Sequence, residues 1–153
     1  MRFQNISSCD VNNGEGVRVT LWVQGCSHHC PGCHNSKSWD FTGGREFTEE
    51  DKAYLFNELD KPYIQGITFC GGEPLDSYDD VIQLIDEIRV KLPEKDIWLY
   101  TGYTKEQLEQ SDKKDVLKKI DVMVDGEFKI EQRDITLPFR GSRNQRIFKF
   151  VNR

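Results

Sequence analysis

Short apolar runs alternate with longer stretches of helical periodicity along this chain. Each run has the length of a buried strand, contains β-branched or aromatic residues, and is bounded by turn-forming residues. Four such runs predict strands, at Val17–Val23, Tyr63–Cys70, Ile97–Tyr100 and Ile120–Val124. A last strand is expected at Ile147–Val151.

Three helices are predicted between these strands. The first should begin at Thr48, which can cap it, with acidic residues in its first turn and Pro62 closing the segment. The second carries one apolar stripe from Val81 to Leu92, and the third starts at a Thr104–Gln107 capping box and breaks near Ser111. Residues 35–47 have no periodicity and predict a long loop, with Trp39 and Phe41 pinning it to the core.

Strands that alternate with helices imply right-handed crossovers and a mainly parallel sheet. A chain of 153 residues is too short for the eight units of a closed barrel. We therefore expect a single α/β domain, residues 1–153, built as an incomplete (β/α) barrel of about five strands with an open side. Functional sites in such folds lie at the carboxyl ends of the strands.

The amino-acid composition excludes several classes of function. The chain has 21 basic and 26 acidic residues, which argues against nucleic acid as the main partner. No apolar stretch approaches the length of a membrane span, and the N-terminus lacks the apolar core of a signal peptide. Five cysteines, three of them on one loop, fit a secreted disulfide framework poorly, so we expect a cytoplasmic protein.

That loop follows the first predicted strand and holds Cys26, Cys30 and Cys33, spaced Cys-x3-Cys-x2-Cys. An ordinary cubane cluster takes four thiolates, and a structural zinc site takes four Cys or His ligands. Three cysteines leave two main hypotheses. Either a nearby histidine (His28, His29 or His34) completes a zinc site, or one iron of a cluster stays open for a substrate. A disulfide is a third interpretation. Cys9 is expected to be a buried structural thiol.

A second candidate motif, Gly71-Gly72-Glu73-Pro74, directly follows the second predicted strand. Two glycines let a backbone come close to a ligand, because no Cβ stands in the way. A freed carbonyl there could accept hydrogen bonds from an α-ammonium group. The alternative is a plain strand-to-helix turn.

Together these motifs resemble those of the radical S-adenosylmethionine (SAM) enzymes. More narrowly, the chain is similar over nearly its whole length to the activating proteins of anaerobic ribonucleoside-triphosphate reductases. Gly32 before the third cysteine is typical of that family, whereas His34 departs from a common tyrosine. The other motifs that carry the resemblance are Asn13–Gly16, Asn35–Trp39, Gly71–Leu75, Asp96–Trp98, Thr101–Tyr103, Val124–Phe128 and Arg140–Gln145.

The resemblance implies an incomplete barrel of the radical SAM type and a site in three parts. Cys26, Cys30 and Cys33 would hold a 4Fe–4S cluster. Gly71, Gly72 and Glu73 would receive the methionine end of SAM, and the backbone around Gly32, Cys33 and His34 would lie against its adenine. No residue is expected to act as an acid or base.

The implied reaction is reductive cleavage of SAM to a 5′-deoxyadenosyl radical, which generates a glycyl radical on the large reductase. An electron donor such as a flavodoxin would supply the electron. The basic segment from Arg140 to Arg153 is expected to be either a docking surface for an acidic partner or an ordinary solvated edge. The alternatives are a small radical SAM enzyme acting on a free metabolite, similar to the deazapurine synthases, and a zinc-binding adaptor.

Overall fold

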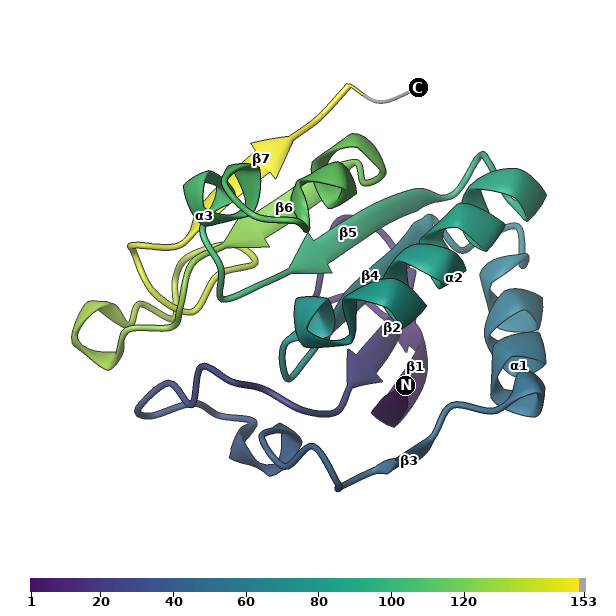
Figure 1. Ribbon diagram of the computed structural model, residues 1–153. Coiled ribbons are helices and arrows are strands. Elements are labelled where there is room, and N and C mark those ends of the chain that lie inside the picture. Colours follow the sequence, from purple (N-terminus) through teal and green to yellow (C-terminus); the bar gives the residue numbers. More distant parts are fainter. Residues whose placement is uncertain (152–153) are drawn as a thin grey trace.

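Four parallel strands form the centre of the sheet in the computed structural model, which describes residues 1–151 (Figure 1). The seven strands of the sheet lie in the order β3-β1-β2-β4-β5-β6-β7. The parallel strands are β2 (Arg18–Val23), β4 (Gly66–Gly71), β5 (Asp96–Tyr100) and β6 (Val122–Asp125). All four correspond to predicted strands, and the mixed α/β fold with an unclosed sheet is confirmed.

Antiparallel strands extend the sheet at both edges. They are β1 (Arg2–Asp10) and β3 (Arg45–Glu46) on one side and β7 (Arg146–Lys149) on the other. The expected count of about five strands was therefore too low, because β1 and β3 were not predicted. Strand β1 has a largely polar sequence in which only Phe3 is fully buried, and β3 has two residues. Main-chain pairing, which leaves no hydrophobic pattern, defines both strands.

The helices begin and end where the sequence places their signals. Thr48 and Thr104 both make capping boxes, and the third predicted helix does break, into α3 and η3. The α-helices are α1 (Glu49–Leu59), α2 (Tyr78–Lys91) and α3 (Lys105–Glu109). The 3-10 turns are η1 (Ser36–Ser38), η2 (Pro74–Ser77), η3 (Lys114–Lys118) and η4 (Ile130–Gln132).

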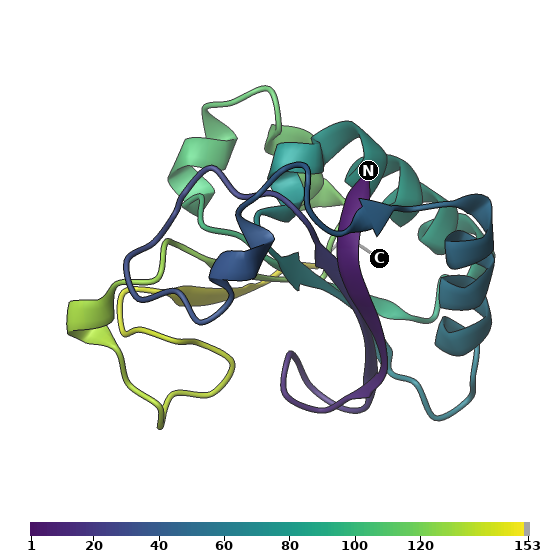
Figure 2. The ribbon, with the colours of Figure 1, turned by 90° about the horizontal axis from the view of Figure 1, so that it is seen from below.

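The two faces of the sheet differ in chemistry because side chains alternate along each strand. One face packs against α1 and α2 and supplies the main core, with Leu21, Phe69 and Leu99 fully buried (Figure 2). The other face carries polar and aromatic side chains, among them Arg18, Thr68 and Trp98. Arg18 is fully buried there and is neutralised by Asp96 at 2.5 Å. This second face leads to the cavity described below.

Two expectations about single residues were wrong. Cys9 is exposed rather than buried, and the Phe41 ring remains half exposed although it lies against Gly25.

Within residues 1–151 we find no helix with the length and apolarity that a membrane span requires.

Candidate functional site

A cavity of about 390 Å³ lies at the carboxyl ends of the parallel strands. Turns from all four central strands contribute to its wall, as parallel topology predicts. The structure thereby brings together every residue expected at the site except Gly32, which lies within the same loop. The lining residues from these turns are Cys26, Cys30, Cys33 and His34 after β2, Gly71, Gly72 and Glu73 after β4, Thr101 and Gly102 after β5, and Gly126 and Glu127 after β6.

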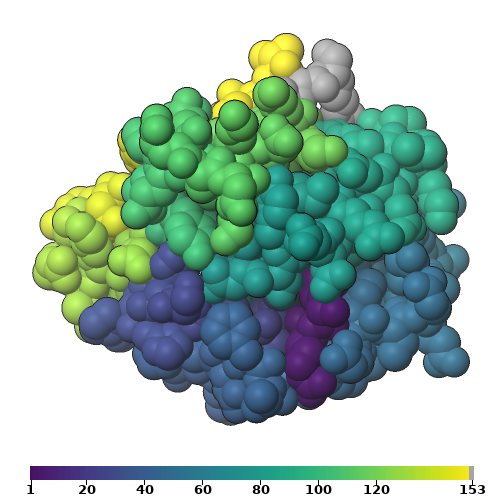
Figure 3. All heavy atoms as spheres, in the orientation of Figure 1, coloured from purple at the N-terminus to yellow at the C-terminus, as the bar shows by residue number. Residues whose placement is uncertain are grey.

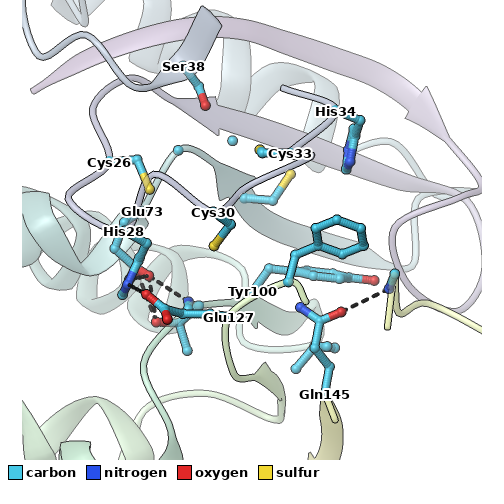
Figure 4. A pocket seen from close by; sticks show the side chains of 18 of the residues that line it. Cys26, His28, Cys30, Cys33, His34, Ser38, Glu73, Tyr100, Glu127 and Gln145 are labelled. Atoms are coloured by element: carbon cyan, nitrogen blue, oxygen red, sulfur yellow. Dashed lines mark hydrogen bonds and ion pairs between the residues drawn. The ribbon is translucent and has the colours of Figure 1, made fainter. Parts of the chain in front are cut away.

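The three loop cysteines face this cavity from one side (Figure 4). Main-chain hydrogen bonds fix both ends of their loop: Gly25 N donates to Ser38 O at 2.6 Å, and Cys33 N donates to Cys30 O at 3.1 Å. Gly32 has a φ of 76°, which favours glycine, and a Cβ there would lie 2.5 Å from Ile130 Cδ1. The space-filling view shows the loop and the segment around residue 130 at the same end of the molecule (Figure 3).

All five cysteines are free thiols, so the disulfide interpretation is wrong. Burial raises the pKa of Cys26 and of Cys30 above the usual range of a thiol, and the charges of Glu73 and Glu127 add to the respective shifts. Both thiols are therefore protonated at neutral pH, and a metal must displace their protons on binding. Three soft donors on one wall fit an iron–sulfur cluster in number and chemistry.

His28 does not have the geometry of a zinc ligand. Its Nε2 lies 2.7 Å from Glu73 Oε1 and its Nδ1 lies 2.8 Å from Glu127 Oε2. Because both partners are carboxylates, both nitrogens donate and the ring is an imidazolium. Burial lowers the pKa of His28, but the hydrogen bonds and charges of Glu73 and Glu127 outweigh it and raise the pKa above 6.5. His28 thus ties the cysteine loop to the turns after β4 and β6.

The other two histidines are placed differently. His29 stacks on Trp39 with ring centroids 4.7 Å apart, whereas His34 lines the cavity. In the part of the chain that the structure describes, no group of three or more His, Cys, Asp or Glu side chains is arranged to hold a single metal ion.

The Glu73 carboxylate is the centre of the hydrogen-bond network beneath the cavity. Only 1% of the residue is exposed. Its Oε1 accepts from Gly102 N at 2.6 Å and its Oε2 from Leu75 N at 3.0 Å, while Thr101 Oγ1 lies within 2.9 Å of both oxygens. Together with His28, these bonds join the turns after β2, β4 and β5. The side chain that was expected to receive SAM is therefore already fully engaged by its own chain.

The two glycines before Glu73 allow close packing of main chain on main chain. A Cβ at Gly72 would collide with the carbonyl oxygen of Gly25 and lie 2.8 Å from that of Ser38. At Gly71 it would collide with the backbone of Val23, and φ is 111°. Gly71 thus packs closely on strand β2 and Gly72 on the cysteine loop, and both glycines also line the cavity. The Gly72 and Glu73 amides donate to Val23 O and Gly25 O, both at 2.8 Å.

Several cavity residues were not anticipated from the sequence. Cys70, Tyr100, Phe139 and Arg140 all line the cavity. The alternation of side chains on β4 and β5 contains a signal for the first two, because Cys70 and Tyr100 occupy the face opposite the helical core. Phe139 and Arg140 lie in an irregular segment, residues 127–145, for which no periodicity exists.

Hydrogen bonds of two amide side chains hold the 127–145 segment closed. Gln145 Oε1 accepts from Gly141 N at 2.9 Å and from Ser142 N at 3.1 Å, and Gln145 Nε2 donates to Gly126 O at 2.9 Å. Asn144 Nδ2 donates to Glu127 O at 2.8 Å. The motif Arg140–Gln145 is thus a structural clasp that returns the chain to β7.

Two residues of the basic C-terminal segment form ion pairs within the chain. Arg146 pairs with Asp125 and Glu106, in each case at 2.6 Å, and Lys149 pairs with Glu15 at 3.1 Å. Arg153 lies outside the described residues. The segment is therefore partly neutralised within its own chain.

Three free thiols facing one cavity at the carboxyl edge of a parallel sheet fit an iron–sulfur protein of α/β architecture. Consistent with this class, the pattern of the family described as "4Fe-4S single cluster domain" matches residues 12–148. Three curated relatives are named anaerobic ribonucleoside-triphosphate reductase-activating protein. The one from Pasteurella multocida (strain Pm70) is 39% identical over 156 residues, covering 99% of both chains.

The relative from Enterobacteria phage T4 is 40% identical, over 97% of this chain and 94% of its own length. The relative from Escherichia coli (strain K12) is 39% identical, over 95% of this chain and 96% of its own length. The chain belongs to the family of anaerobic ribonucleoside-triphosphate reductase-activating proteins. The resemblance inferred from the motifs is confirmed.

Proposed function

We propose that this protein activates an anaerobic ribonucleoside-triphosphate reductase by generating a glycyl radical on it. Cys26, Cys30 and Cys33 would hold a 4Fe–4S cluster, and the same cavity would receive SAM. When bound, this pair supplies the chemistry: one electron cleaves SAM to methionine and a 5′-deoxyadenosyl radical, which takes a hydrogen atom from a glycine of the reductase.

The observation that carries the proposal is that three unpaired thiols and the Gly71–Glu73 turn border one cavity. Turns after β2, β4, β5 and β6 surround this cavity, which supports a partial barrel of the radical SAM type formed by a single domain, residues 1–153.

The residues of this chain bind, orient and exclude water. The main chain of Gly71 and Gly72 borders the methionine end of SAM, and the backbone of Gly32, Cys33 and His34 borders its adenine. Glu73 positions the turns after β4 and β5 beneath the cavity, because its carboxylate accepts hydrogen bonds from Leu75, Thr101 and Gly102. His28 holds the cysteine loop in register with that network.

The wider setting follows from the same proposal. The partner is the large reductase subunit, the electron comes from a donor such as a flavodoxin, and the reaction takes place in the cytoplasm. A glycine is a suitable target because its radical is delocalised over the flanking amides and because the strand can enter a narrow site without a Cβ.

The test is anaerobic incubation of the reconstituted protein with a reductant, SAM and a reductase whose glycines carry deuterium. Deuterium should appear in 5′-deoxyadenosine, and a glycyl radical should appear on the reductase by EPR. Cleavage of SAM without label transfer or a protein radical would refute the activase function and favour a free metabolite as substrate. Colourless protein that binds zinc and no SAM would favour an adaptor.

A further inference from the structure

A buried cation lies beneath the face of the sheet that leads to the cavity. Arg18, the first residue of β2, is fully buried and forms an ion pair with Asp96. Its Nη2 also donates to Ile67 O at 2.9 Å. A buried ion pair gives little net stability compared with apolar residues of the same volume, because both charges lose their hydration. Stability alone therefore does not account for Arg18, and its remaining donors indicate a second role.

These remaining donors hold the turn between β1 and β2. Arg18 Nη1 donates to Glu15 O at 2.9 Å, and Arg18 Nε donates to Thr68 Oγ1 at 2.8 Å. The Thr68 hydroxyl in turn donates its own proton to Asn13 O at 2.6 Å. Gly14, with a φ of 131°, lies directly on the side chain, since a Cβ there would be 2.7 Å from Arg18 Cδ. The guanidinium therefore fixes three successive residues of the turn.

Arg18 also contacts a second segment of the chain through Trp98. Its Cζ lies 5.4 Å from the centroid of the buried Trp98 ring. The same ring packs edge-to-face on Phe139, with centroids 5.2 Å apart, and Phe139 has a φ of 58°, which is rare for a bulky residue. A cation over an aromatic ring and an edge-to-face aromatic pair both depend on orientation. The position of Phe139 therefore depends on that of Arg18 through one intervening ring.

The two segments that Arg18 holds are two borders of the cavity: the turn, residues 11–17, and the 127–145 segment. Asn12 and Asn13 of the turn line the cavity, and so does Phe139, whereas Arg18 itself does not. Figure 2 shows the turn and the 127–145 segment on the same side of the sheet, away from the helices. One buried side chain thus joins two borders that lie far apart in the sequence.

The turn leaves β2 at the end remote from the cysteine loop. Strand β2 has six residues, with Arg18 first and Val23 last, so at roughly 3.3 Å per residue its ends are about 16 Å apart. The cysteine loop and the Gly71–Glu73 turn, proposed to border SAM, follow the carboxyl ends of β2 and β4. The border that Arg18 holds directly is therefore better placed to meet a polypeptide entering the cavity than to meet SAM.

We propose that Arg18 is a positioning residue that fixes the spacing between these two borders, and that this spacing determines how the glycine-bearing segment of the reductase fits. The inference rests on the proposed function. Arg18 acts through the turn and through Phe139 without touching either reactant. A change in the spacing should leave the cysteine loop intact but misplace the target glycine, and a displacement of about 1 Å is enough to slow a reaction strongly.

The experiment compares Arg18→Lys and Thr68→Val with wild type, using the full chain reconstituted anaerobically with iron and sulfide. Lysine keeps the charge but lacks the planar fork that reaches both Glu15 and Thr68, and valine removes the hydroxyl that holds Asn13. The readouts are the KM for intact reductase and the amount of 5′-deoxyadenosine formed per glycyl radical. Both should rise, about tenfold in Arg18→Lys and about threefold in Thr68→Val, as for loss of a charged and a neutral hydrogen bond.

SAM affinity, measured by equilibrium dialysis, and iron content should equal those of wild type in both variants. Thr68→Ser is the rescue variant, because serine keeps the hydroxyl, and it should restore the wild-type KM. Arg45→Lys is the matched control for the change of arginine to lysine, since the Arg45 side chain is 65% exposed and does not line the cavity.

All assays are run well below the Tm of each variant, so that a loss of stability alone leaves KM unchanged. A KM and a product ratio equal to those of wild type in both variants would overturn the positioning role. So would a loss of SAM affinity with unchanged KM, because the borders would then serve SAM. If Arg18→Lys does not fold, the comparison of Thr68→Val with Thr68→Ser decides. If wild type itself forms no glycyl radical, the proposed function fails, and this inference fails with it.

Discussion

Replacing Glu73 by glutamine tests whether its carboxylate holds the site together. The side chain is 1% exposed and each oxygen faces a main-chain donor, Gly102 N at Oε1 and Leu75 N at Oε2. Whichever way the introduced amide turns, its NH2 group opposes one of these N–H groups. One buried donor left unsatisfied costs roughly 1–3 kcal/mol, and loss of the charge weakens the bond to His28 by about 1 kcal/mol more. We expect Glu73→Gln to lower the free energy of unfolding by about 3 kcal/mol.

The assay is urea denaturation of the apo protein, followed by tryptophan fluorescence under reducing conditions. A thermal melt should show a Tm lower by about 6–12 °C, from roughly 2–4 °C for each kcal/mol in a chain of this size. Glu109→Gln is the control, since Glu109 is a surface residue whose one ion pair within residues 1–151 is to Lys105, and its effect should stay within about 0.5 kcal/mol. If Glu73→Gln unfolds like wild type yet no longer binds SAM, the carboxylate contacts the ligand directly and the positioning role is wrong.

Three further predictions concern the cysteine loop. Single alanine variants of Cys26, Cys30 and Cys33 should lose the brown colour and most of the iron after anaerobic reconstitution, whereas Cys70→Ala should keep both. Cys70 lines the same cavity, so loss of iron in Cys70→Ala would identify Cys70 as a fourth cluster ligand and refute the open iron. Gly72→Ala should lose iron and about 1–3 kcal/mol of stability together, because its Cβ meets the Gly25 carbonyl, and wild-type values in iron assays and urea melts would contradict that close approach. The pKa of His28 in the folded protein lies above 6.5, so its charged ring stabilises the apo fold fully below pH 6.5 and this contribution is lost as the pH rises through the folded pKa. The difference in unfolding free energy between wild type and His28→Gln, measured by urea melts, should therefore decrease with rising pH. A difference that increases would refute the imidazolium.

Much of the fold and the outline of the site could be predicted because their signals are local. The four central strands and the capping residues Thr48 and Thr104 follow from hydrophobic periodicity and end chemistry, which act over a few residues. The assembly of the four turns around one cavity follows from parallel topology alone. Strand β1 could not be predicted, since main-chain pairing with β2 defines it and its side chains are mostly polar.

The roles of several site residues could be assigned only from the tertiary structure. The spacing of Cys26, Cys30 and Cys33 establishes that three thiols share a loop, but it leaves the role of each neighbouring histidine open. Only the fold brings Glu73 and Glu127, 45 and 99 residues further along the chain, to the two nitrogens of His28.

The sequence by itself thus determined the chemistry this protein contains: its thiols, its glycine turn and the strands that precede them. The tertiary structure decided which groups are saturated and which remain available, because that depends on contacts between residues far apart in the chain. The Glu73 carboxylate is fully hydrogen-bonded to three neighbouring turns, and Gly72 packs closely against the cysteine loop. Tyr100 and Arg140 line the cavity, yet the Oη of the first and the Nε of the second are buried beneath its surface. Burial and partnering are properties of the packed chain, and no local pattern contains them.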